Sequence, residues 1–140
     1  MVKRCLAAAL LALAVCAALS GCARQAPTGS QARVTLDGVP WTGEALPGGE
    51  GDLRVIITLD GETLIDLPFS RARTVSVVQP DGSENNITLT GDAVYMQSAN
   101  CENQDCVGMG AVTRDNLELR VMGGFIICLP HRLSVEVRGE

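Results

Sequence analysis

The chain has 140 residues, of which 46% are hydrophobic and only 3% aromatic, and its formal net charge is −5. Residues 22–140 are more acidic than the whole, because they carry nine arginines, no lysine and all sixteen acidic residues, a net charge of −7. A nucleic-acid surface needs a basic patch, so this balance argues against nucleic-acid binding. It also argues against electrostatic attraction to anionic lipids, so any membrane attachment must be hydrophobic.

Residues 1–21 have the features of a bacterial lipoprotein signal peptide. Two basic residues precede an apolar run at 6–19, which is too short to span a bilayer comfortably. The motif Leu-Ser-Gly-Cys follows at 19–22, the pattern after which the cysteine thiol receives a diacylglyceryl group. An ordinary secretory peptide with a chance cysteine is the weaker interpretation. We predict that Cys22 is lipidated and anchors the chain to the bacterial cell membrane, with the domain on the extracytoplasmic side.

Residues 22–52 have the composition of a flexible tether. Three prolines and six glycines fall within residues 23–52, without a sustained apolar period. Such a composition buries too little surface to offset the entropy of ordering it. Residues 34–38 and Trp41 are the exception, and we expect them to dock on the domain as an edge segment, although Trp41 is also a candidate partner contact. The folded domain is then expected over residues 53–140.

The pattern of that domain is all-β. Short apolar or alternating stretches are separated by turn residues, and Asp-Gly dipeptides at 60–61 and 81–82 are strong turn signals. The strands are predicted at 53–59, 62–67, 74–79, 85–90, 93–99, 117–121, 125–129 and 133–137.

The run at 125–129 is almost continuously apolar, which is typical of a buried central strand, whereas 133–137 alternates as a half-exposed strand does. Strands at spacings near ten residues, without a convincing helix, predict a small β-sandwich or partly open barrel. We expect seven to eight mostly antiparallel strands.

Enzyme signatures are absent from the sequence. It has no serine-hydrolase elbow, no zinc-protease helix motif, no phosphate-binding glycine loop and no calcium loop. A dyad of Cys128 with the single histidine, His131, is conceivable but has no third group to orient it. We therefore predict neither enzymatic activity nor a cofactor.

The remaining chemistry is confined to residues 101–131, which hold Cys101, Cys106, Cys128 and His131. We favour a structural disulfide between Cys101 and Cys106, with Cys128 as a buried hydrophobe and His131 near the surface. The same four residues have the number and type of ligands for tetrahedral zinc, but the first spacing is wider than usual, so a metal is not favoured. A redox or exchange cysteine, such as a switchable disulfide involving Cys128, is the third possibility.

Three stretches carry a family resemblance. They are V-I-I-T-L-D-G at 55–61, the cysteine-containing block at 91–110, and F-I-I-C-L-P-H-R-L-S-V-E-V at 125–137. Together they resemble the NusG domain II family over residues 53–139, in a form that stands alone in exported or membrane-anchored bacterial proteins. The chain departs from the family at 101–103, where Cys-Glu-Asn replaces a frequent Cys-Pro-Asp.

The resemblance implies a small all-β domain without established catalytic activity, in proteins that act as accessories to membrane systems. A role in transcription does not transfer, because lipidation places this domain outside the cytoplasm. We expect a non-enzymatic lipoprotein module that binds a protein partner at the membrane. The alternative is a redox or metal-binding accessory of an extracytoplasmic electron-transfer system that uses Cys101, Cys106, Cys128 and His131.

Overall fold

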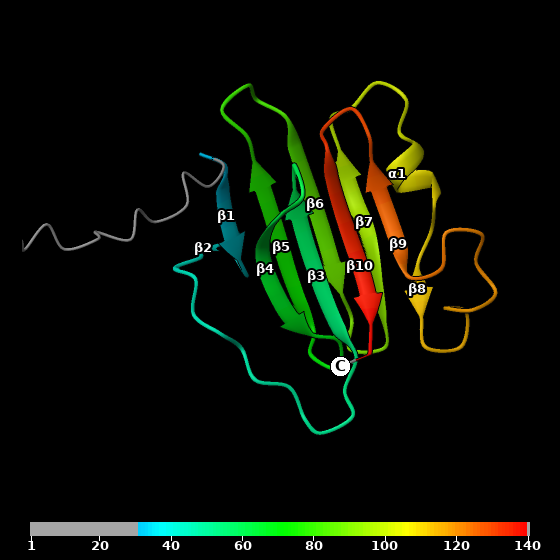
Figure 1. The fold of residues 1–140 in the computed structure, drawn as a ribbon. Coiled ribbons are helices and arrows are strands. Elements are labelled where there is room, and N and C mark those ends of the chain that lie inside the picture. Colours follow the sequence, from blue (N-terminus) through cyan, green and yellow to red (C-terminus); the bar gives the residue numbers. More distant parts are fainter. Residues whose placement is uncertain (1–30, 140) are drawn as a thin grey trace, which may run out of the picture.

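The computed structural model describes residues 31–139, which form two stacked antiparallel sheets and one short helix (Figure 1). The first sheet has the order β2-β1-β5-β6-β7-β8. Its strands are β1 (Arg33–Leu36), β2 (Val39–Pro40), β5 (Arg73–Val78), β6 (Glu84–Leu89), β7 (Ala93–Ala99) and β8 (Val112–Thr113). The second sheet, β4-β3-β10-β9, contains β3 (Arg54–Leu59), β4 (Glu62–Pro68), β9 (Phe125–Cys128) and β10 (Leu133–Arg138). This sandwich confirms the predicted fold class, and the sheets do not close into a barrel.

The core lies between the two sheets, where every second side chain of each long strand is buried. In β10 the buried residues are Leu133, Val135 and Val137, as the alternation predicted, with exposed fractions of 0%, 0% and 4%. From the opposite sheet, Val75 and Ile87 contribute to the same core cluster. Each such side chain contributes about 1.5–3 kcal/mol when it is fully buried. Because β9 pairs with β10, the same core also fixes the position of Cys128.

The β3–β4 hairpin follows the turn chemistry of its sequence. Asp60 and Gly61 have φ angles of 52° and 83°, the left-handed values that a two-residue type I′ turn requires. Arg132, in the β9–β10 turn, holds the same turn from the side, because its Nε lies 2.5 Å from Asp60 Oδ1. The predicted Asp-Gly turn is thus confirmed, and it places two chain reversals of the second sheet at the same end.

The segment predicted as a tether contains ordered structure. Strand β1 pairs antiparallel with β5, from Arg33 opposite Val78 to Leu36 opposite Val75, and Trp41 N–H donates to Val34 O at 2.8 Å. The predicted docked edge segment is therefore confirmed, and the β-structure begins well before residue 53. The signal peptide and Cys22 lie outside the described residues. Within residues 31–139 no helix has the length and apolar character needed to cross a bilayer.

The prediction of a strand at 117–121 is wrong. Residues 114–124 form successive turns instead, with Leu119 and Val121 at exposed fractions of 84% and 102%. Arg120 holds this segment, the excursion at 114–124, together. Its guanidinium donates to the carbonyls of Met109, Ala111, Gly123 and Phe125. The alternation of apolar and polar residues imitated a strand, but no neighbouring strand pairs with it.

The prediction that residues 125–129 form a buried central strand is also wrong, although β9 lies within this range. It forms an edge of the second sheet, with Phe125 partly exposed and Leu129, just beyond its end, 77% exposed. Helix α1 (Asp105–Gly108), which the sequence did not predict, lies beside β9 (Figure 1). Ile127 N–H is directed at the sulfur of Met109, 3.3 Å away, so the loop after α1 covers part of this edge.

Candidate functional site: a buried cluster of three thiols

Strand β9 brings Cys128 into the core. The residues of β9 alternate between the two faces of the sheet, so Ile126 and Cys128 point inward and are 0% and 1% exposed. Cys128 lies opposite Leu133 of β10, whose side chain is fully buried. The predicted burial of Cys128 is confirmed, and its thiol faces the space between the sheets.

Cys101 and Cys106 reach the same place through a folded loop after β7. The turn depends on Gln104, which has a left-handed φ of 55° and precedes the first residue of α1. Its side-chain amide donates to Ala99 O at 2.7 Å and to Cys101 O at 2.5 Å. These bonds return the chain toward β7, so that Cys106 points inward from α1. Sequence reasoning missed Gln104; its only signal was a polar amide inside the C-x4-C motif.

The three sulfur atoms form a compact cluster. All three Sγ atoms lie within 4.8 Å of one another, and those of Cys101 and Cys106 are 3.7 Å apart. The exposed fractions of Cys101, Cys106 and Cys128 are 6%, 1% and 1%. The disulfide predicted between Cys101 and Cys106 is not formed in this structure, since a bond requires about 2.05 Å between the sulfurs.

Burial controls the protonation of Cys106. It raises the pKa of the Cys106 thiol to about 12, and hydrogen bonding with Cys128 and then Cys101 acts in the same direction. Cys106 is therefore protonated at neutral pH and is a poor nucleophile, because the thiolate is the reactive form. Cys101 is the least buried of the three and lines a surface cleft together with Glu102, Pro130 and other residues of the two adjoining loops.

His131 does not join the sulfurs. Its ring is buried, 6% exposed, with Nδ1 2.8 Å from Asn85 Oδ1, and its backbone oxygen accepts from Gln79 Nε2 at 2.9 Å. The predicted surface position is wrong, because the tight β9–β10 turn, with Arg132 at a φ of 54°, returns the chain against the first sheet. An amide oxygen only accepts, so Nδ1 carries the proton. Sequence reasoning did not single out Asn85 or Gln79 as its partners.

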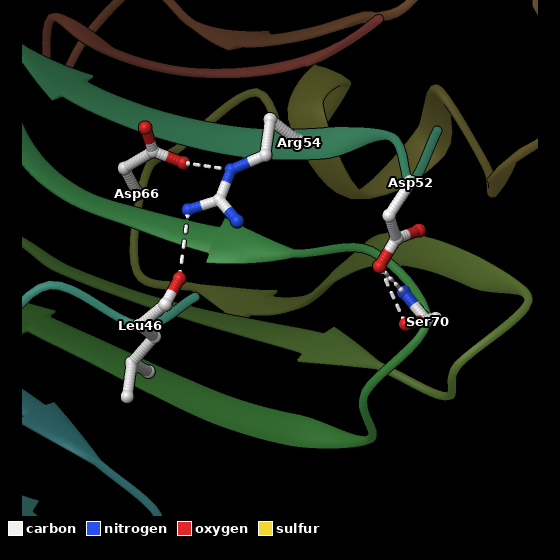
Figure 2. A network of polar contacts seen from close by, with 5 residues as sticks. All are labelled: Leu46, Asp52, Arg54, Asp66 and Ser70. Atoms are coloured by element: carbon white, nitrogen blue, oxygen red, sulfur yellow. Dashed lines mark hydrogen bonds and ion pairs between the residues drawn. The ribbon is translucent and has the colours of Figure 1, made fainter. Parts of the chain in front are cut away.

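A second buried polar group lies at the opposite end of β3. Asp52 accepts from Ser70 Oγ at 2.5 Å, from Ser70 N–H at 3.4 Å and from Arg114 Nη2 at 2.8 Å, and Figure 2 shows the contacts with Ser70. The hydroxyl bond from Ser70 is the main reason that the pKa of Asp52 lies below its usual value. Arg114 also lies over the Phe69 ring, 5.4 Å from its centre. The contacts of Asp52 with Ser70 and Arg114 thus connect three segments of the chain, and their role is structural.

Figure 2 also shows how the segment before β3 is held. Arg54 Nε lies 2.8 Å from Asp66 Oδ1, and Arg54 Nη2 donates to Leu46 O at 3.0 Å. The guanidinium thus joins β4 to the irregular segment that leads out of β2. These contacts fasten the chain and offer no nucleophile or acid–base pair.

Unlike the contacts of Asp52 and Arg54, the thiol cluster has side chains that can carry out redox chemistry or bind a metal. Two of its sulfurs can be oxidised to a disulfide, the third can exchange with that bond, and all three can act as soft ligands to a metal. A Cys128–His131 dyad finds no support, because the hydrogen bond of the His131 ring goes to Asn85. Of the four residues in the predicted site, the structure therefore unites the three cysteines and separates the histidine.

The fold is similar to that of solved bacterial proteins. The Lin0431 protein from Listeria innocua is 21% identical, with a TM-score of 0.53, over 62% of this chain and 95% of that protein. A DUF1312 family protein, EF3258 from Enterococcus faecalis, is 22% identical, with a TM-score of 0.53, over 61% of this chain and 95% of that one.

No protein with a curated description matches this chain. The sequence model described as NusG domain II matches residues 6–140, which is nearly the whole chain. The chain therefore belongs to the NusG domain II family.

Proposed function

We propose that this chain is a membrane-anchored extracytoplasmic accessory protein whose β-domain carries a dithiol–disulfide centre. The observation that supports this most directly is the cluster of Cys101, Cys106 and Cys128, with all sulfurs within 4.8 Å. A purely structural disulfide needs two cysteines. A third thiol within reach of that pair makes the bond exchangeable, because a nearby thiol can attack either of its sulfurs.

The reaction begins at Cys101, which is the least buried thiol and lines the cleft. Its thiolate attacks the disulfide of a partner protein, forming a mixed disulfide and releasing one partner thiol. The Cys106 sulfur, 3.7 Å from Cys101 Sγ, then displaces the second partner thiol and closes the Cys101–Cys106 bond. Two electrons pass from the domain to the partner, and the two thiol protons end on the partner's two thiols.

Cys128 gives the oxidised centre a second state. Attack of its sulfur on Cys106 transfers the bond to the Cys106–Cys128 pair and releases Cys101 as a thiol at the cleft. Cys106 is thus common to both disulfides. Its raised pKa makes the Cys106 thiol itself a poor nucleophile, which suits a resolving cysteine that acts only after Cys101 has formed the mixed disulfide beside it.

The redox proposal is tested on the full chain in detergent, equilibrated with glutathione buffers, quenched with acid and mapped by mass spectrometry. We expect a reversible Cys101–Cys106 bond with a reduction potential above about −300 mV, the region of exchangeable rather than structural disulfides. Cys106→Ser should abolish the bond, whereas Cys128→Ser should retain it. A bond that glutathione cannot reduce, or thiols that never oxidise, would contradict the proposal.

The membrane location is supported by the Leu-Ser-Gly-Cys motif at 19–22. Cys22→Ala removes both the acceptor thiol and the residue that directs cleavage, so the variant should lose fatty-acid labelling and keep its signal peptide. Cys16→Ala, in the apolar run of the same peptide, is the matched control and should be labelled normally. Labelling of Cys22→Ala at the wild-type level would exclude this form of anchoring.

A second candidate function, partner binding without redox chemistry, is favoured by one apolar surface. Leu119, Val121 and Met122, close together in the excursion at 114–124, are 84%, 102% and 45% exposed, and Phe125 follows them in the chain. Exposed apolar side chains gathered in this way often mark protein interfaces. A photo-cross-linker at position 121 should give one specific adduct in membranes, and one at the exposed Glu62 should not. Equal cross-linking from both positions would remove this candidate.

A further inference from the structure

The spacing of the three sulfurs also suits a metal ion. A cation bound by thiolates at about 2.3 Å separates its sulfur ligands by roughly 3.8–4.0 Å, in tetrahedral or planar coordination. The sulfurs of Cys101 and Cys106 are 3.7 Å apart, and Cys128 Sγ lies within 4.8 Å of both. Only small side-chain rotations would place all three around one ion.

The ligand atoms are uniformly soft. The group contains three sulfurs and neither a carboxylate nor an imidazole. Asp105, the acidic residue directly before Cys106, is engaged by Asn103, whose Nδ2 donates to Asp105 Oδ2 at 2.7 Å, and the His131 ring is held by Asn85. Thiolate ligands select Cu(I) and Zn(II) over the hard cations that prefer oxygen.

A small cavity adjoins the sulfurs. Its volume is about 30 Å³, and Cys106 and Cys128 contribute to its wall, with Asn103, Asp105 and residues 127–130 around the remainder. That volume accommodates about one water molecule. A three-sulfur site beside such a space has room for a fourth, exogenous ligand, which Zn(II) requires and trigonal Cu(I) does not.

We propose that Cys101, Cys106 and Cys128, in their reduced state, form a binding site for one thiophilic d10 cation, Cu(I) or Zn(II). This inference deepens the proposed function by naming a ligand for the same thiols, and it requires only that they be reduced. It differs from the four-residue zinc site considered from the sequence, because His131 is not a ligand. The ion is bound by thiolates, so binding releases thiol protons and transfers no electron.

The environment of the sulfurs supports the bound state in two ways. Burial shields the cation from competing water and excludes larger ligands. Gln104 Nε2 lies 3.7 Å from Cys101 Sγ, so an amide donor already faces one sulfur on which negative charge develops. Gln104 also orients the loop that carries Cys101, as an outer-shell partner of a metal ligand does.

The test titrates the reduced full chain in detergent, without oxygen, with Cu(I) or with Zn(II) against a competing chelator. The readouts are stoichiometry, sulfur-to-metal charge-transfer absorption and released protons. We expect one ion per chain with at least one of the two cations. Each of Cys101→Ser, Cys106→Ser and Cys128→Ser should weaken binding by more than the roughly 10–100-fold that loss of an outer-shell partner costs. Gln104→Ala should fall within that range.

His131→Gln is the matched control. It should retain the wild-type affinity, and circular dichroism of every variant establishes that it is folded. No binding of either cation by the folded wild type, or unchanged affinity in the three serine variants, would overturn the inference, as would loss of binding in a folded His131→Gln chain. Metal binding without a reversible disulfide refutes the redox function alone, and a reversible disulfide without metal binding refutes this inference alone.

Discussion

The hairpin framework at residues 54–99 and the segment at 101–131 differ in the regularity of their secondary structure. In the framework, strands β3 to β7 follow one another with short turns, and successive strands pair within each sheet. In the second segment, a four-residue helix, a two-residue strand and a series of turns precede β9. All three cysteines of the described residues lie in this less regular segment, at positions that only the sandwich brings together.

This contrast indicates where a small all-β domain can place a reactive site. Regular hairpins satisfy their backbone groups through neighbouring strands, so their side chains are free only to pack. In the second segment, side chains satisfy part of the backbone: Gln104 donates to the carbonyls of Ala99 and Cys101 before α1, and Arg120 donates to four carbonyls around the excursion at 114–124. That freedom from pairing lets Cys101 and Cys106 reach Cys128, which the pairing of β9 with β10 holds in the core.

The largest expected effect is in the framework. Val135→Asp buries a carboxylate without a partner at a position that is 0% exposed, and should cost more than about 3 kcal/mol of unfolding free energy. Its neighbour Glu136 points to the opposite face, so Glu136→Lys is the control and should cost less than about 1 kcal/mol. Thermal denaturation of both variants is the measurement. Equal melting temperatures would invalidate the assignment of the buried face.

Gly124 lies where the irregular segment enters β9. A substitution at this position tests whether the segment is as tightly packed there as the framework is. A Cβ there would lie 2.1 Å from Val137 O, so the backbone must shift, and Gly124→Ala should cost about 1–3 kcal/mol. Gly108, at the end of α1, has open space where a Cβ would lie and is the control. Urea denaturation should show Gly108→Ala to be neutral or slightly stabilising; destabilisation equal to that of Gly124→Ala would contradict this.

Asp52 joins the two regions through Ser70 and Arg114. Asp52→Asn should cost about 1–3 kcal/mol at neutral pH, because the buried charge-assisted hydrogen bonds are weakened. The folded-state pKa of Asp52 lies below its ordinary value of 3.8, so its ionised form stabilises the fold above that pH. This contribution is lost as pH falls through the folded-state pKa. The difference between wild type and variant should therefore shrink on acidification, and a difference that grows would contradict the assignment.

The smallest effect is expected on the excursion at 114–124. Leu119→Ser and Val121→Ser remove side chains that are almost wholly in solvent, and each should change the unfolding free energy by less than about 0.5 kcal/mol. Leu117 is only partly exposed and packs against the core, so Leu117→Ser should cost more. Chemical denaturation of the three variants tests this. A large loss of stability at Val121 would mean that this side chain is covered in solution.

The regular strands and turns of this protein can be predicted from local sequence patterns. Period-two alternation and Asp-Gly turns predicted the strands of the framework and the buried face of β10, because a half-buried strand and a type I′ turn are local requirements. The same local reasoning failed at 117–121, where the alternation is present but no strand pairs with it, and at β9, whose apolar run lies at a sheet edge.

The arrangement of the candidate site depends on tertiary contacts that local sequence patterns do not specify. Sequence spacing grouped Cys101, Cys106, Cys128 and His131, yet three of them converge and the histidine binds Asn85 of β6 instead. Which side chains meet depends on the stacking of two sheets and on turns such as those at Gln104 and Arg132. These are contacts between residues far apart in the chain, and no local pattern encodes their direction.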